Sequence, residues 1–289
     1  MPELPEVQAL ATDLTRRLAG RTIARLEVVS INALRTVEPP VSALAGQTIE
    51  HVERHGKFLD IVAGDVRLVM HLSLAGWVRW HDGGGTAPPP AHPGKGPLVA
   101  RLLLDDGARL DVTEYGTRHA VALYVVRRPE EVPGITRLGP DPLAQDFTRD
   151  TLAQILGHAG RSRIKGVLRD QARVAGIGNA YSDEILHAAR LSPFKPASSF
   201  DDTEVDQLFE AVRAVLSDAV ARADGMGAAD LKREKKLAMQ VHGHTGQPCP
   251  VCGDTVLQVV YSDSTMQYCP TCQTGGRPLA DRALSRLLK

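Results

Sequence analysis

The sequence predicts an α+β protein, with an N-terminal helix and a two-sheet β-sandwich, then a helical domain, then a C-terminal zinc ribbon. Three observations support this fold class. Short β-type runs separated by Gly and Asp turn signals fill residues 22–126, and apolar residues three and four apart dominate from residue 148. All four cysteines lie near the C-terminus in two Cys-x-x-Cys pairs. The 289 residues are enough for about two domains and a small appendage.

We expect the first domain at residues 1–140. Apolar spacing predicts a helix over Val7–Leu18. The Gly- and Pro-rich residues 82–97 are expected to form a long surface loop. Two prolines and a glycine in Leu138–Pro142 stop both strand and helix, which marks the boundary. The β-type runs are Thr22–Val29, Thr48–Glu53, Phe58–Val62, Arg67–His71, Leu98–Leu104, Ala108–Val112 and Ala120–Val126.

The second domain, at residues 141–228, is expected to be helical. Residues Gly225-Met226-Gly227 close it, and residues 229–289 should hold a loop, the zinc module and a short amphipathic tail. The predicted helices are Thr151–Ala159, Ile164–Gln171, Ala180–Ala189 and Thr203–Ala223.

Charge and hydropathy limit the ways in which the chain can bind nucleic acid or a membrane. The formal net charge is zero, which argues against a polybasic-tail mode of nucleic-acid binding, because whole-protein charge does not then drive the encounter. Basic residues instead cluster locally, in residues 161–173 and 231–236. No apolar run approaches the ~20 residues that cross a bilayer, and we see no cleavable apolar leader. We therefore expect a cytoplasmic protein without a membrane partner, associated with the nucleoid if the host is bacterial.

The cysteines have the spacing of a metal site. Cys249 and Cys252 form one pair, Cys269 and Cys272 the other, and sixteen residues separate the pairs. This spacing is typical of tetrahedral zinc. Disulfides are the alternative, which an intracellular chain without further cysteines disfavours. We expect one structural zinc ion, because four thiolates leave no open position, and no organic cofactor.

The first six residues, Met1-Pro2-Glu3-Leu4-Pro5-Glu6, can place an amine beside two carboxylates. Removal of Met1 would make the Pro2 nitrogen a secondary amine, and an α-amino group has a pKa of about 7.7–8.0 against about 10.4 for lysine. Such an amine can attack a sugar C1′ and yield an iminium, with Glu3 and Glu6 available as acid and base. The structural alternative is a capped start to the following helix.

Four segments occur in the order found in one known family. They are Pro2–Val7, Arg54–Leu59, Gly176–Tyr181 and the four-cysteine C-terminus. In these motifs, which frame nearly the whole chain, the protein resembles the formamidopyrimidine-DNA glycosylase and endonuclease VIII family. The resemblance implies a DNA repair enzyme that is both a glycosylase and an abasic-site lyase, acting on damaged double-stranded DNA. We expect it to act as a monomer.

The resemblance also implies roles for individual residues. Pro2 would attack C1′, Glu3 would protonate the opening sugar, and Glu6 would support the amine and the substrate. Lys57 would contact a phosphate and assist β-elimination. Considered alone, Lys57 would be read as a surface lysine.

Further residues resemble the family's DNA contacts. Gly176–Asn179 is similar to its helix-two-turns-helix element, in which Lys165 and Asn179 would grip the backbone beside the lesion. His71–Gly76 is similar to the strand-end segment that fills the gap left by a flipped base. Leu74 is the wedge candidate there, because an apolar side chain replaces lost stacking. The structural alternatives are an ordinary helix connector for Gly176–Asn179 and a core position for Leu74.

The chain departs from the family at two positions that matter. The family's Arg-Phe pair for the opposite strand is replaced by the stretch Thr113–His119, in which Arg118 is the available arginine without a fixed register. Ser264 lies five residues before the third cysteine, at the tip of the zinc hairpin, which we call the fingertip. The family carries a phosphate-clamping arginine at this position. Serine lacks the permanent charge and bidentate donors of arginine, so we expect weaker incision that stops after β-elimination.

Two questions stay open at this point. The stretch between Gly227 and Gln240 is shorter than the loop that covers 8-oxoguanine in the family's purine-specific branch. The resemblance therefore favours oxidised pyrimidines or bulkier lesions as substrates. The missing fingertip arginine also allows a catalytically silent protein that binds damaged DNA or junctions. A zinc-ribbon protein unrelated to the family would require all the ordered matches to be accidental.

Overall fold

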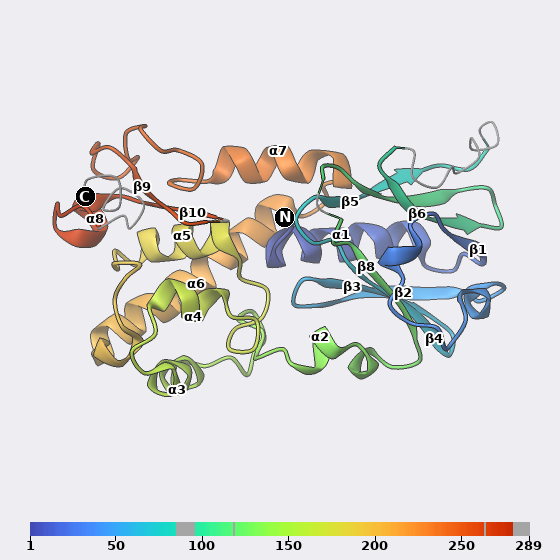
Figure 1. The fold of residues 1–289 in the computed structure, drawn as a ribbon, viewed down its shortest axis with the longest axis horizontal. Helices are drawn as coiled ribbons and strands as arrows, with labels where there is room; N and C mark the ends of the chain where they lie inside the picture. The colour runs from blue at the N-terminus through green and yellow to red at the C-terminus, as the bar shows by residue number, and fades with distance from the viewer. Residues whose placement is uncertain (85–95, 118, 263, 280–289) are drawn as a thin grey trace. The chain divides into compact units, whose positions relative to one another are not determined.

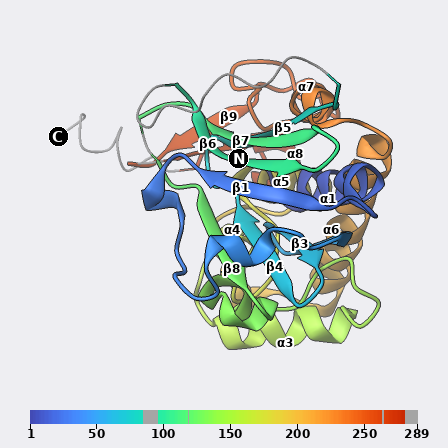
Figure 2. The same cartoon turned by 90° about the vertical axis from the view of Figure 1, so that its right-hand side faces the viewer.

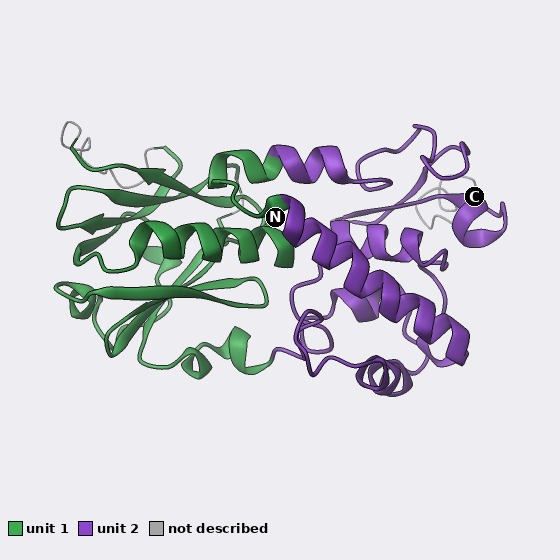
Figure 3. Ribbon diagram, turned by 180° about the vertical axis from the view of Figure 1, so that it is seen from behind, with its two compact units in different colours: residues 1–137, 223–232 green, residues 138–222, 233–289 purple. Residues whose placement is uncertain are grey.

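The computed structural model describes residues 1–84, 96–117, 119–262 and 264–279. The chain forms two compact units (Figure 3): unit 1 comprises residues 1–137 and 223–232, and unit 2 comprises residues 138–222 and 233–289. Most of the expected loop at 82–97, the residue Arg118 and the tail at 280–289 lie outside the described residues.

Unit 1 contains the predicted sandwich. Helix α1 (Leu4–Leu18) comes first, and it packs against strands β2 and β3 (Figures 1 and 2). The two antiparallel four-stranded sheets have the orders β1-β6-β7-β5 and β2-β3-β4-β8. The strands are β1 (Ile23–Val28), β2 (Ile49–His55), β3 (Phe58–Ala63), β4 (Val66–His71), β5 (Gly76–His81), β6 (Leu98–Leu104), β7 (Arg109–Glu114) and β8 (Ala122–Val126). The predicted α+β class and its two sheets are confirmed.

The core of unit 1 lies between the sheets and the helix. Pro5 lies in the first turn of α1, where the proline ring fixes the backbone angle φ near its helical value. Leu10, Leu14 and Leu18 recur at helical spacing, and each has at most 1% of its surface exposed. They join one cluster with strand residues such as Leu59. The alternating and continuous apolar runs of the sequence therefore do form one buried layer.

Strand β5 was missed by the sequence analysis. It pairs with β7 from Gly76↔Glu114 to His81↔Arg109. Its residues Trp77 to His81 mix aromatic, basic and apolar side chains, so the alternation was obscured beside a Gly-rich stretch. Trp77 is 7% exposed, and its indole N–H donates to the Ala228 carbonyl at 2.8 Å.

Unit 2 contains the predicted helices and the cysteine module. Within unit 1, a single turn, α2 (Pro133–Thr136), precedes the division between the units. The helices and strands after it are α3 (Arg149–Ala159), α4 (Ile164–Arg169), α5 (Asn179–Ala188), α6 (Asp202–Ala223), β9 (Leu257–Val260), β10 (Thr265–Tyr268) and α8 (Pro270–Thr274). None of the helices in the described part of the chain is long and apolar enough to cross a membrane.

Helix α7 corrects an expectation. The sequence analysis placed a loop after residue 228, whereas the structure has a helix over Ala228–Ala238, with residues 228–232 in unit 1 and the remainder in unit 2. The segment is rich in strong helix formers, yet Leu231 is its one buried residue. Its apolar periodicity was therefore too weak to be recognised.

A buried ion pair in unit 1 gives the first prediction. The guanidinium of Arg101 donates to both carboxylate oxygens of Asp111, at 2.7 and 3.0 Å, and the two residues are 5% and 7% exposed. Asp111→Ala removes this bidentate partner from a buried cation, so urea unfolding should show a loss of about 3–5 kcal/mol. The control is Asp65→Ala, which breaks the exposed pair with Arg127 and should cost less than about 1 kcal/mol. Equal losses in the two variants would contradict the prediction.

Candidate DNA-repair site

The N-terminal segment gathers the predicted acid and base. Glu3 and Glu6 are 2% and 3% exposed, and the Glu6 carboxylate accepts the backbone N–H of Glu3 at 2.8 Å. This bond closes the first turn of α1 and fixes the segment on which Pro2 sits. Met1 is 42% exposed, so it is accessible for removal.

Lys57 lies in a two-residue hairpin loop between β2 and β3, closed by the pair His55↔Phe58. Gly56 precedes it with φ +56°, a conformation that suits glycine at the first loop position. The lysine is 8% exposed, so the surface-lysine alternative is wrong. Arg54 donates to the Gln8 side chain at 2.8 Å and thereby links the end of β2 to α1.

His71 ends β4 directly opposite Phe58, and the two rings have centroids 4.7 Å apart. Burial and the nearby positive charge of Lys57 lower the pKa of His71 to about 4. The ring is therefore neutral at physiological pH, and it can contact DNA as a hydrogen-bonding group but not as a cation.

Leu74 lies in the loop between β4 and β5. It is 57% exposed, so the core alternative is wrong for this residue. The preceding Ser73 has φ +53°, a left-handed conformation that is uncommon outside glycine. The wedge role remains a prediction, and an exposed apolar side chain is what that role requires.

In the stretch expected to face the opposite strand, the described residues offer Tyr115 rather than Arg118. Tyr115 is 48% exposed, and its hydroxyl accepts from Arg79 at 2.7 Å. The same guanidinium lies 5.5 Å from the centre of the ring. An exposed ring held by a cation can stack on a base. The sequence analysis missed this pair because Arg79 belongs to the unrecognised strand β5.

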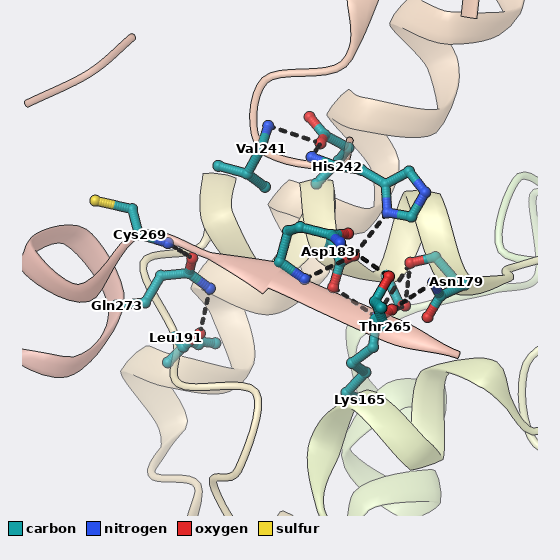
Figure 4. Close-up of polar contacts among 12 residues, drawn as sticks. Lys165, Asn179, Asp183, Leu191, Val241, His242, Thr265, Cys269 and Gln273 are labelled. Carbon is teal, nitrogen blue, oxygen red and sulfur yellow. Dashed lines mark hydrogen bonds and ion pairs between the residues drawn. The ribbon is translucent and has the colours of Figure 1, made fainter. Parts of the chain in front are cut away.

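In unit 2, Lys165 is buried against helix α5 (Figure 4). Its ammonium donates to the Asn179 carbonyl at 3.1 Å, the Ser182 hydroxyl at 2.8 Å and the Asp183 carboxylate at 2.5 Å. Only 5% of Lys165 is exposed. The interactions described for this side chain thus join α4 to α5, and its contact with a phosphate stays a prediction.

Asn179 is the first residue of α5, one residue before the predicted helix start at Ala180. Its side-chain amide donates to the Thr265 carbonyl of β10 at 2.7 Å (Figure 4). Ser264 immediately precedes Thr265 at the hairpin tip, where its carbonyl accepts the Tyr261 N–H at 2.8 Å. The structure thus brings the start of α5 and the fingertip together.

Asp183 and His242 are site residues that sequence reasoning missed. The Asp183 carboxylate also accepts from His242 Nδ1 at 2.8 Å and from the Gln267 backbone N–H at 3.3 Å. Its neighbour Glu184 accepts the backbone N–H groups of Gln240, Val241 and His242 at 2.7 to 3.0 Å. Burial raises the pKa of Glu184. An acidic pair on a buried helix face was the only signal that could have suggested this cluster.

The four cysteines come together as predicted. One sulfur from each lies within 4.8 Å of the others. The Sγ atoms of Cys252 and Cys269 are 3.3 Å apart and those of Cys249 and Cys272 are 3.9 Å apart. Tetrahedral zinc with Zn–S bonds of about 2.3 Å needs sulfurs about 3.8 Å apart. The cluster therefore fits a tetrahedral metal ion.

The structure combines a two-sheet sandwich, a helical unit and a four-cysteine cluster, as the sequence predicted. The model of the formamidopyrimidine-DNA glycosylase N-terminal domain matches residues 1–118, and that of the formamidopyrimidine-DNA glycosylase H2TH domain matches residues 138–230. The chain belongs to the formamidopyrimidine-DNA glycosylase family, as the sequence motifs indicated.

Individual relatives agree with this assignment. The chain is 58% identical over 153 residues to an uncharacterised formamidopyrimidine-DNA glycosylase-like protein of Mycobacterium tuberculosis, covering 53% of this chain and 94% of that one. It is 37% identical to the formamidopyrimidine-DNA glycosylase of Symbiobacterium thermophilum, over 94% of this chain and 89% of that one. The Lactococcus lactis formamidopyrimidine-DNA glycosylase, solved non-covalently bound to DNA containing an abasic site, superimposes with a TM-score of 0.80. That comparison has 26% identity and covers 94% of this chain and 99% of the other.

The lowered pKa of His71 predicts a pH dependence of stability. The folded protein takes up this proton near pH 4, whereas the unfolded chain takes it up near 6.5. Stability should therefore fall on acidification, by about 2 kcal/mol between pH 7 and pH 5 from this residue. His71→Asn should lose that part of the decrease, as measured by urea unfolding at both pH values. An unchanged pH dependence in the variant would contradict the assignment.

Proposed function

We propose that the protein is a bifunctional DNA glycosylase and abasic-site lyase, in which the Pro2 nitrogen is the nucleophile. The observation that carries this proposal is the first turn of α1. There, Glu3 and Glu6 are both buried within four residues of Pro2, and the Glu6 carboxylate accepts the Glu3 backbone N–H. Both carboxylates also form the capping box of α1, so the capped-start alternative holds for the helix. The proposal adds a catalytic use, because the cap places the same two carboxylates beside a potential amine.

In the proposed reaction the damaged nucleotide is flipped out and the Pro2 nitrogen attacks C1′. The N–C1′ bond forms as the glycosidic bond breaks, and the proton that the amine nitrogen loses leaves with the departing base. Glu3 protonates the ring oxygen as the sugar opens, which leaves an iminium. That cation acidifies the C2′ proton, whose loss expels the 3′ phosphate in β-elimination. Water then hydrolyses the iminium and restores the amine.

Lys57 and Glu6 have supporting roles in this scheme. Glu6 holds the N-terminal turn through the Glu3 N–H and supports the amine and the substrate. Lys57 contacts the phosphate next to the lesion and assists proton transfer during elimination. Positioned groups of this kind contribute typically 10²–10⁴ each.

The proposed partner is damaged double-stranded DNA, bound by a monomeric, cytoplasmic protein. The solved relative bound to abasic DNA supports this choice. Leu74 would occupy the gap left by the flipped base, while Asn179, Lys165 and the fingertip would hold the backbone. The cysteine cluster would hold one structural zinc ion, which stabilises the hairpin and takes no part in the chemistry.

The fingertip favours a single elimination step. Ser264 offers one short hydroxyl where the family carries a charged fork, so the second, δ-elimination lacks its cation. The same observation favours the second candidate function, a silent protein that binds damaged DNA or junctions. The two functions differ in whether a covalent adduct forms.

Covalent trapping tests the proposal. Borohydride reduction on a duplex with one abasic site should yield a covalent adduct with the wild-type protein, in which intact mass shows that Met1 is removed. Pro2→Gly should reduce trapping by about 100-fold or more, because the secondary amine is lost. The matched control, Pro5→Ala, changes a proline of the same turn and should stay within about threefold. A trimmed, metal-loaded wild type that binds the duplex without trapping would contradict lyase activity and favour the silent binder.

Restoring the fingertip cation gives a further prediction. Wild-type protein should produce mainly the β-elimination product from an abasic duplex. Ser264→Arg should shift the product several-fold towards the doubly phosphorylated gap, as resolved by denaturing gel electrophoresis. Ser264→Gln supplies similar reach without charge and should not. A wild-type product that is already mainly the doubly phosphorylated gap would overturn this prediction.

A further inference from the structure

A histidine from outside the cysteine module touches one of its sulfurs. His187 lies near the end of α5 and is 5% exposed. Its Nε2 lies 3.3 Å from the Sγ of Cys249, which is itself 2% exposed. The contact lies within sulfur hydrogen-bond distance and joins residues 62 positions apart in the chain.

The side chain of Gln273 connects the other cysteine pair to the turn that follows α5. The Gln273 amide accepts the Cys269 backbone N–H at 2.9 Å and donates to the Leu191 carbonyl at 3.0 Å (Figure 4). Leu191 follows α5 by three residues. Both Cys-x-x-Cys pairs are therefore attached to α5 or to the turn after it.

The chemistry of the cluster makes the His187 contact consequential. Four thiolates around a divalent zinc carry a net charge of −2, and holding such charge in a partly buried site is costly unless hydrogen bonds compensate it. A thiolate can only accept, so the imidazole nitrogen that faces it must carry a hydrogen. The Cys272 backbone N–H supplies a longer contact to Cys269, at 3.5 Å. His187 supplies a side-chain donor to Cys249.

We propose that His187 is a positioning residue for the metal site: its Nε2–H donates to the Cys249 thiolate, so that zinc retention depends on helix α5. The inference rests on the zinc site of the proposed function. Groups that hydrogen-bond to metal ligands typically contribute 10- to 100-fold to metal affinity.

Helix α5 also supports the fingertip hairpin. Asn179 bonds the Thr265 carbonyl and Asp183 accepts the Gln267 N–H, so β10 is attached to the same helix. Helix α5 therefore holds both the cysteine cluster and the fingertip hairpin. Loss of the His187 contact should therefore weaken the attachment of the cysteine cluster to α5 before it affects the fingertip hairpin.

The test measures zinc affinity of the full chain by competition with a chromogenic chelator. His187→Phe keeps a ring of similar size without a donor, and it should weaken zinc binding by about 10-fold or more. His187→Gln keeps an N–H and should stay within about threefold of wild type. The control is His244→Phe, because His244 lies in the same module and its ring bonds to Gln247 instead.

Site-resolved alkylation separates the hydrogen bond from a general loss of structure. With limiting zinc, mass spectrometry should show Cys249 as the cysteine whose alkylation accelerates most in His187→Phe. Similar acceleration at all four cysteines would indicate simple unfolding and overturn the proposal. So would a zinc affinity within twofold of wild type. A wild type that holds no zinc would instead refute the metal site itself.

Discussion

The carboxylate of Asp183 is the interaction on which much of unit 2 depends. It is fully buried and receives the Lys165 ammonium, the His242 imidazole and the Gln267 backbone N–H. These groups come from α4, from the segment after α7 and from β10. An unpaired carboxylate at this depth would cost several kcal/mol. The three elements are consequently held in one arrangement, and the predicted DNA contact Asn179 lies one helical turn away.

Unit 1 uses the same physical device at smaller scale. Glu6 accepts the Glu3 N–H, and this bond orients the residues that surround Pro2. Arg54 then connects the hairpin that bears Lys57 to the same helix. Each unit thus builds its site by burying a polar group and satisfying it with backbone or side-chain partners. Fully satisfied polar networks of this kind rigidify a buried site.

Sequence alone predicted what depends on local chemistry. The sandwich runs, the helix after the glycine-bearing turn and the four-cysteine cluster follow from periodicity, turn residues and spacing. Strand β5 and helix α7 escaped because their apolar residues are sparse. The pairs Asp183 with His242 and Arg79 with Tyr115 escaped because residues far apart in the chain meet only in the fold. The burial of Lys165 escaped for the same reason, since a lysine in a basic stretch gives no sign of a buried acid.

The loop between β4 and β5 shows how stability and function compete in this fold. Ser73 adopts a left-handed conformation, and Leu74 leaves 57% of an apolar side chain in water. Both features cost free energy in the protein without DNA. Under the proposed function, this free-energy cost preorganises the wedge, because Leu74 is already exposed before the protein binds damaged DNA. Selection for thermal stability alone would favour other residues at these two positions, so a variant stabilised there should melt at a higher temperature and fill the gap left by a flipped base less well.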